Sequence, residues 1–106
     1  MDSPVVVFCT FPDAETARRI ATELVERRLA ACVNLLPGVE SIYRWDGKTE
    51  RANEVLGLIK TARYTDLEPA LKELHPYDVP EIIALPVSAG LPDYLEWLAA
   101  GSCDGH

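Results

Sequence analysis

The sequence predicts a single α+β domain with a ferredoxin-like, split βαβ sheet, a long central β-hairpin and one further helix at the C-terminal end. The elements follow the order strand, helix, strand, strand, helix, strand. Residues 32–61 alternate as a β-hairpin around Asp46-Gly47. Segments on both sides of this hairpin repeat apolar residues at helical spacing. We expect the domain to occupy residues 1–100 and residues 101–106 to form a disordered tail.

The first strand and the first helix come from the segment before the hairpin. Residues 5–10, VVVFCT, are a short β-branched apolar run, which is typical of a buried central strand. Asp13 is a good N-cap for a helix over residues 14–28. The apolar residues of this helix recur on one face: Ala17, Ile20, Ala21, Leu24 and Val25.

The hairpin turn fixes the register of its two arms. Asp-Gly favours a type I′ turn, because both central residues of that turn need positive φ. A two-residue loop sets three pairs directly opposite each other: Trp45 and Lys48, Tyr43 and Glu50, Ile42 and Arg51. Pro37-Gly38 interrupts the first arm and indicates a kink or bulge there.

The hairpin is too long for one small domain to cover. Each arm has about thirteen residues and would span ~43 Å, whereas a compact chain of this size is only ~35 Å across. We therefore expect the hairpin to protrude, with Tyr43 and Trp45 near its tip, and an obligate oligomer to cover it. The alternative is a bent hairpin that curls over its own helices, which Gly38 would permit.

Three shorter elements follow the hairpin. Asp66 is predicted to cap a second helix that holds Pro69 in its first turn and ends at residue 74 or 75. Residues 81–85 form an apolar strand between Pro80 and Pro86, which favours an edge position. Residues 91–100 form the terminal helix.

Composition and charge exclude several classes of protein. A chain of 106 residues that is 48% hydrophobic can build one core. The net charge of −7 disfavours nucleic-acid binding and permits cation binding. No apolar run reaches the ~18 residues of a membrane span, and the N-terminus lacks a signal-peptide pattern. Three cysteines without a C-x-x-C pair predict reduced thiols. We expect a cytoplasmic protein that contacts no membrane.

No known catalytic or phosphate-binding motif is present, so we predict no enzyme and no required cofactor. The segment from His75 to Glu81 is dense in polar chemistry, although His75 could simply cap the second helix. Cys9 is either core or, together with His75, a soft-metal ligand. Cys103 and His106 in the tail are a further candidate metal pair. Tyr43 and Trp45 are of types enriched at subunit interfaces.

Motifs along residues 4–100 resemble those of the CutA divalent-cation tolerance family. They are Ala31-Cys32-Val33-Asn34, Pro37-Gly38, Ser41, Tyr43-x-Trp45-x-Gly47-Lys48, Glu50, Glu54, Lys60-Thr61, His75-Pro76-Tyr77, Pro80-Glu81-Ile82 and Tyr94-Leu95-x-Trp97-Leu98. The resemblance implies a ferredoxin-like protomer, a homotrimer built through the long hairpins with PII-like architecture, and a cytoplasmic role linked to copper and other divalent cations.

The resemblance also implies functional residues. Cys9 and His75 match the family's metal ligands, and Glu81 is added as a weaker third ligand. Leu74 stands where some members carry a second histidine, so the predicted copper binding is weak. The predicted inter-subunit cleft contains Tyr43, Trp45, Glu50, Lys60 and Tyr77. An alternative function is a trimeric sensor of a small anionic metabolite, with Lys60 and helix ends supplying positive potential.

Overall fold

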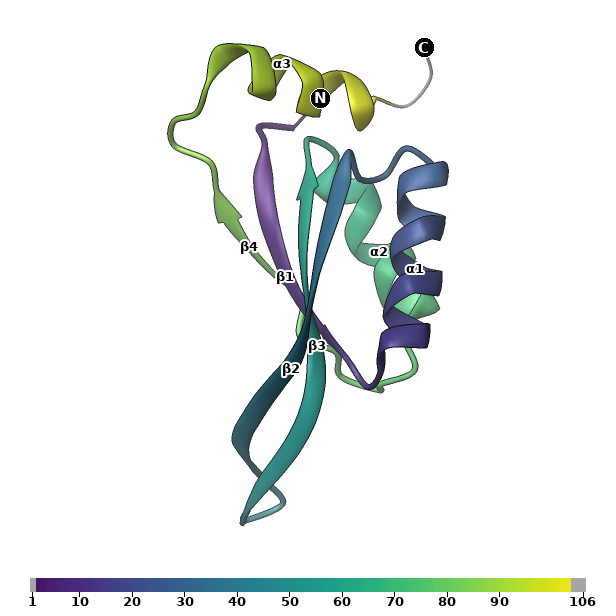
Figure 1. Ribbon diagram of the computed structural model, residues 1–106, viewed down its shortest axis with the longest axis vertical. Helices are drawn as coiled ribbons and strands as arrows, with labels where there is room; N and C mark the ends of the chain where they lie inside the picture. Colours follow the sequence, from purple (N-terminus) through teal and green to yellow (C-terminus); the bar gives the residue numbers. More distant parts are fainter. Residues whose placement is uncertain (1, 104–106) are drawn as a thin grey trace.

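The computed structural model describes residues 2–103 and shows one four-stranded antiparallel sheet with three helices (Figure 1). The elements are β1 (Val5–Phe11), α1 (Ala14–Glu26), β2 (Cys32–Trp45), β3 (Lys48–Thr61), α2 (Tyr64–Leu74), β4 (Ile83–Pro86) and α3 (Pro92–Gly101). The strand order is β2-β3-β1-β4. The predicted α+β, ferredoxin-like class is confirmed. Within residues 2–103, no helix is long and apolar enough to cross a bilayer.

The core lies between the sheet and the helices α1 and α2, which sit side by side on one face (Figure 1). β1 is central, as predicted, because it pairs with β3 on one side and with β4 on the other. Its alternate residues Val7, Cys9 and Phe11 are fully buried under the helices. Gly57 lies opposite Cys9, and a Cβ at Gly57 would stand 2.8 Å from the Phe11 ring. Glycine at this position therefore lets Phe11 lie across β3.

The start of α1 follows the prediction, and its end comes earlier than predicted. The Asp13 carboxylate accepts the backbone N–H of Thr16 at 2.8 Å. The helix ends at Glu26 rather than at residue 28, because Arg28 turns into the left-handed region with φ of 59°. The chain then reaches β2 after a short connection.

The hairpin has the predicted turn and register. Asp46 and Gly47 have φ values of 53° and 77°, and Trp45 lies opposite Lys48. The predicted interruption is a register shift between Leu36 and Val39, where Gly38 has φ of 74°. The predicted pairs Tyr43 with Glu50 and Ile42 with Arg51 are also present.

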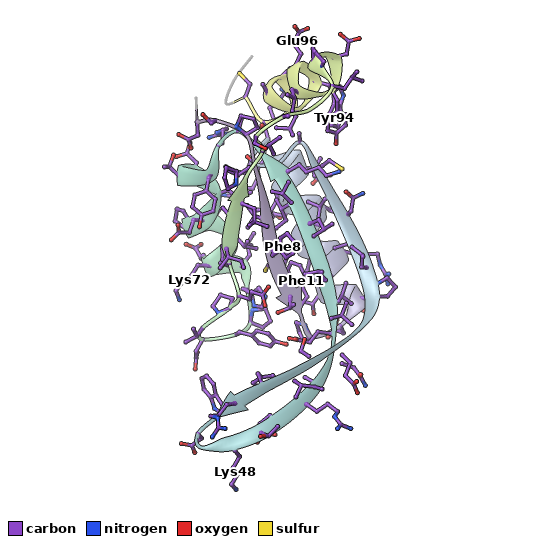
Figure 2. The ribbon with its side chains drawn as sticks, turned by 90° about the vertical axis from the view of Figure 1, so that its left-hand side faces the viewer. Phe8, Phe11, Lys48, Lys72, Tyr94 and Glu96 are labelled. Atoms are coloured by element: carbon purple, nitrogen blue, oxygen red, sulfur yellow. The ribbon has the colours of Figure 1, made fainter. Side chains whose placement is uncertain are left out.

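The hairpin extends beyond the body of the domain. The molecule measures 45 Å along its longest axis but only 25 and 22 Å along the others, and the hairpin forms the narrow end (Figure 1). Ile42 and Trp45 are each 61% exposed. The tip curves beneath the loop that joins α2 to β4 (Figure 2) and does not curl over α1 and α2. Protrusion is therefore confirmed, and the alternative of a hairpin curled over its own helices is wrong.

The face of the sheet opposite α1 and α2 carries apolar side chains that residues 2–103 leave partly open. Residues directly opposite each other on paired strands share a face. Ile83 lies opposite Phe8, and Leu85 lies opposite Val6, and these two β4 residues are 55% and 48% exposed. Leu36 on β2 is 41% exposed. An apolar sheet face of this kind is typical of an interaction surface.

The predicted start of the second helix is wrong. α2 begins at Tyr64 with Arg63 as its N-cap, so Pro69 is the sixth helical residue rather than part of the first turn. The earlier start is stabilised from outside the helix: the Asp2 carboxylate accepts both the backbone N–H and the hydroxyl of Thr65 at 3.0 Å. The end at Leu74, with His75 as C-cap, is as predicted.

The predicted edge strand and the final helix are present, and residues 101 and 102, which were predicted to belong to a disordered tail, are ordered. β4 pairs only with β1, and α3 lies across the end of the sheet beside the N-terminus (Figure 1). Gly101 belongs to α3, and Ser102 is fully buried. The Ser102 hydroxyl accepts the N–H of Ala62 at 2.9 Å and donates to the carbonyl of Leu98 at 2.8 Å. Residues 104–106 lie outside the described chain, so the prediction for them is untested.

Replacement of Ser102 by Ala should destabilise the fold, because it leaves the buried N–H of Ala62 without its acceptor. We expect a loss of about 1–3 kcal/mol in the free energy of unfolding. Urea unfolding at fixed protein concentration measures this. Ser88→Ala, at an exposed position, is the matched control and should change little. Equal stability of the Ser102 variant and wild type would show that the Ser102 bond does not anchor α3.

Candidate ligand cleft and metal site

A cleft of about 420 Å³ opens where the hairpin faces the loop that joins α2 to β4. This volume lies within the range of small-molecule sites. Its lining comes from the end of β1, from both arms of the hairpin and from the loop: Thr10, Tyr43, Trp45, Glu54, Tyr77, Asp78, Val79 and Glu81. The cleft thus collects aromatic, hydroxyl and carboxylate groups that lie far apart in the sequence.

Tyr43 and Trp45 reach the cleft together because alternate residues of a strand point to the same face. The register set at the turn decides which face this is, since a slip of one residue would turn both rings away. Glu54 enters from β3, and the acidic residues Asp78 and Glu81 enter from the loop. The cleft therefore depends on the turn at the hairpin tip.

His75 lies behind the cleft and ties the loop to the sheet. It is 7% exposed, and its ring stacks on Phe11 with centroids 5.2 Å apart. Its Nε2–H donates to the carbonyl of Thr10 at 2.8 Å, and its Nδ1 accepts the N–H of Tyr77 at 3.1 Å. Both ring nitrogens are thus in use. Burial lowers the pKa of His75, against the opposing effects of the Thr10 carbonyl and Glu54. The ring is neutral, and it serves as both a C-cap and a loop anchor.

Tyr77 joins the loop to the hairpin. Its hydroxyl donates to Glu54 Oε2 at 2.8 Å, and its ring lies 4.7 Å from that of His75. Burial raises the pKa of Tyr77, and the hydrogen bond to Glu54 adds to this effect. The phenol therefore stays protonated and holds the carboxylate in place.

Cys9 lies on the buried side of β1, next to the cleft residue Thr10. It is fully buried, and its Sγ lies 3.9 Å from the carbonyl of Thr10 that His75 also binds. Burial, together with the nearby carboxylates of Glu81 and Glu54, raises the pKa of the Cys9 thiol to about 12. The thiol is protonated near neutral pH.

The structure thus brings the predicted metal ligands into one neighbourhood without arranging them as a metal site. Cys9 and His75 meet at the Thr10 carbonyl, and Glu81 lines the cleft in front of it. Within residues 2–103, no cluster of three or more His, Cys, Asp or Glu side chains is placed to hold a metal ion. A metal would have to displace the hydrogen bonds of His75 and the proton of Cys9.

The residues predicted for an inter-subunit cleft fall into two groups in the single chain. Tyr43, Trp45 and Tyr77 line the cleft. Glu50 lies opposite Tyr43 on the hairpin but does not line the cleft. Lys60 lies near the other end of β3, where its Nζ is 3.3 Å from the Tyr94 hydroxyl and 5.6 Å from that ring's centroid. The positive charge predicted for this cleft is therefore not supplied within one chain.

Four residues of the cleft were absent from the predicted site: Thr10, Glu54, Asp78 and Val79. Glu54 belonged to the motifs that carry the family resemblance, but its link to Tyr77 is a tertiary contact over 23 residues of sequence. Asp78 stood within the polar segment that the sequence singled out. Thr10 was visible only as the end of a strand.

Comparison with known proteins identifies the family. A family model described as "CutA1 divalent ion tolerance protein" matches residues 5–101. The chain belongs to the CutA1 divalent ion tolerance family. It is 54% identical over 98 residues to the divalent-cation tolerance protein CutA of Pectobacterium atrosepticum, with 91% of this chain and 89% of that protein covered. The resemblance inferred from motifs is thus confirmed.

Solved structures of CutA1 proteins share the fold. The divalent cation tolerance protein of Thermus thermophilus aligns with a TM-score of 0.90 at 49% identity, covering 94% of this chain and 99% of the other. CutA1 of Oryza sativa aligns with a TM-score of 0.92 at 42% identity, and the alignment covers 98% of this chain and 97% of the other. Each of these two structures therefore aligns with this chain over nearly its whole length.

The neutral state of His75 predicts a pH-dependent stability. The unfolded chain accepts a proton at a pKa of ~6.5, whereas the folded chain resists protonation. The stabilisation is thus complete above that pH and is lost as the pH falls from there through the lower folded pKa. His75→Gln retains a side-chain N–H donor but cannot titrate. Urea unfolding at pH 7.5, 6.0 and 5.0 should show a smaller loss in this variant than in wild type.

Two outcomes separate this explanation from general acid destabilisation. His106→Gln replaces the other histidine of the chain and should leave the wild-type pH profile unchanged. An identical loss of stability in wild type and His75→Gln between pH 7.5 and 5.0 would contradict a neutral, buried His75.

Proposed function

We propose that this CutA1 family member is a cytoplasmic homotrimer of divalent-cation tolerance, which binds copper and related cations weakly and catalyses no reaction. The observation that carries the proposal is the charge of the cleft. Three carboxylates, those of Glu54, Asp78 and Glu81, line it, and no basic side chain within residues 2–103 does. A concave surface lined by one sign of charge concentrates ions of the opposite sign.

Copper is favoured by the donors directly behind the cleft. Soft and borderline metals prefer thiolate and imidazole, and Cys9 and His75 meet at the carbonyl of the cleft residue Thr10. Glu81 is the third proposed ligand. Binding must be weak, because the metal has to displace the thiol proton and break a hydrogen bond of a buried ring. A weak, exchangeable site suits tolerance or response rather than a structural role.

The homotrimer is proposed because the single chain leaves apolar surface open at two places. These are the hairpin tip, with Ile42 and Trp45, and the sheet face that includes Ile83 and Leu85. Both places must be covered if the exposed apolar area is to leave water. The family resemblance and the protruding hairpin favour copies of the same chain as the cover. The proposed cytoplasmic setting agrees with Cys9 and Cys32 being thiols rather than half-cystines.

A second candidate function is a small-molecule sensor with PII-like architecture. The observation that favours it is the size and lining of the cleft, which at about 420 Å³ far exceeds what a bare ion fills and which presents aromatic surface. In this alternative the ligand sits against Tyr43 and Trp45, and neighbouring subunits of the trimer close the cleft.

Copper titration by calorimetry tests the proposed metal function. We expect Cu²⁺ to bind more tightly than Mg²⁺, and Cys9→Ser and His75→Ala each to weaken Cu²⁺ binding by about tenfold or more, since even indirect partners of a metal typically contribute that much. Binding should also weaken below about pH 6 as imidazole is protonated.

The control for this titration is a Cys103→Ser, His106→Ala double variant. Substitution is preferable to truncation at residue 100, because Ser102 is buried and bonded to Ala62. Loss of copper binding in the double variant alone would place the ligands in the C-terminal tail and refute the site at Cys9 and His75.

Replacement of Trp45 by Ala should weaken assembly more than metal binding. Truncation of a buried interface tryptophan typically costs about 2 kcal/mol or more. Size-exclusion chromatography in mild denaturant should show the variant dissociating at lower denaturant concentration than wild type, with copper affinity preserved. An assembly as robust as wild type, combined with lost ligand binding, would instead assign Trp45 to the cleft alone.

A further inference from the structure

We propose that the cleft formed by the hairpin and the α2–β4 loop binds an organic ammonium ion, with its charge on the loop carboxylates and its hydrocarbon part against the aromatic rings. This refines the second candidate function and rests on it for the location of the ligand. The proposed ligand is a cation, whereas the sequence suggested an anionic metabolite.

The charge of the lining decides the sign of the ligand. Glu54, Asp78 and Glu81 contribute three carboxylates, and the nearest histidine, His75, is neutral because both of its nitrogens are engaged in hydrogen bonds. Lys60, the residue expected to attract an anion, is held at the Tyr94 hydroxyl instead. An anion entering this cleft would meet like charge without a counter-ion from residues 2–103.

The aromatic rings decide between a metal ion and an organic cation. In the single chain, Tyr43 and Trp45 present rings that are 45% and 61% exposed, and Tyr77 adds a third ring from the loop. Ring faces are no ligands for hard divalent ions, but they attract alkylammonium groups through cation–π interaction. Tryptophan is the strongest of the three aromatic types in this respect. Rings and carboxylates together are thus complementary to a cation with an apolar body.

The dimensions of the cleft agree with this class of ligand. A water molecule occupies about 30 Å³ in the liquid, so the cleft of about 420 Å³ is many times larger than a bare metal ion. Within the described residues, moreover, no three ionisable side chains converge as metal ligands. A short alkyl chain that carries one or two ammonium groups could contact the rings and carboxylates at once.

The lining is held in place before a ligand arrives. The Tyr77 hydroxyl fixes Glu54 Oε2, and His75 fixes the loop through the N–H of Tyr77 and the carbonyl of Thr10. Tyr43 and Trp45 occupy alternate positions of β2, whose register is set by the turn. Such preorganisation lowers the entropy lost on binding.

The test is a comparison of three ligands of similar length and different charge on the assembled wild-type protein. Butane-1,4-diamine is the cation, butane-1,4-diol its neutral counterpart, and succinate the anion. Calorimetry and ligand-observed NMR should detect saturable binding of the diamine and of tetramethylammonium. The diol and succinate should bind about tenfold more weakly or not at all. Added salt should weaken diamine binding.

Two substitutions locate the site. Glu81→Gln removes one charge, and Trp45→Leu removes one ring, and each should weaken diamine binding about fivefold or more. Glu96→Gln on α3 is the matched control for charge, because Glu96 lies on α3 at the opposite end of the molecule from the hairpin tip (Figure 2). Sedimentation of each variant separates loss of binding from loss of assembly.

Binding of the diol or of succinate as tight as that of the diamine would overturn the ammonium proposal while leaving a small-molecule site in place. Failure of all four compounds to saturate would remove the small-molecule function as well. Copper titration of the wild-type and Trp45→Leu proteins tests the metal proposal separately, because Cys9 and His75 lie behind the cleft lining and only Glu81 is shared by the two proposals. Preserved copper binding with no diamine binding would therefore leave the metal proposal standing alone.

Discussion

The two-residue turn at Asp46-Gly47 is the constraint on which the rest of the molecule depends. Both residues adopt positive φ, and the turn sets a register that runs through arms of fourteen residues each. Side chains alternate along a strand, so this register determines which residues meet the helices, which lie on the open face and which face the cleft. A slip of β2 by one residue would turn Trp45 away from the cleft.

The length of the hairpin links the fold to assembly. The helices cover only the part of β2 and β3 that lies beside β1, and the tip extends past them (Figure 1). The elements within residues 2–103 leave Ile42 and Trp45 exposed. The same geometry creates the cleft, because the twisted tip approaches the loop between α2 and β4. Assembly and ligand binding are therefore expected to be coupled through the hairpin.

His75 connects the core to the cleft. Gly57 makes room for Phe11, Phe11 supports the His75 ring, and the ring holds both the end of β1 and the N–H of Tyr77. A structural role of this kind competes with metal ligation, since a nitrogen that binds a metal must release its hydrogen bond. This competition is a physical reason for the proposed copper binding to be weak.

Local rules allowed most of the fold to be predicted from the sequence. The Asp13 cap, the turn with its register, and the bulge before Val39 each depend on a few neighbouring residues. The start of α2 could not be predicted in this way, because Asp2 supplies the acceptor from more than sixty residues away. Burial of Ser102 likewise depends on Ala62.

The site was only partly predictable for the same reason. Strand alternation predicted that Tyr43 and Trp45 share a face, whereas family resemblance implied their place in the cleft and the proximity of Cys9 and His75. The hydrogen bond between Tyr77 and Glu54 could not be predicted, because it joins a loop to a strand that lies beside it only in the folded chain. The place of Lys60 in an inter-subunit cleft stays a prediction, and its contact with Tyr94 within one chain could not be foreseen from the motif.

Sedimentation equilibrium at micromolar concentration tests the central claim most directly. If the protruding hairpin and the open sheet face need copies of the same chain to cover them, the protein should sediment at three times the chain mass of 11.7 kDa, without a detectable folded monomer. A stable, fully folded monomer of 11.7 kDa at that concentration would contradict the account.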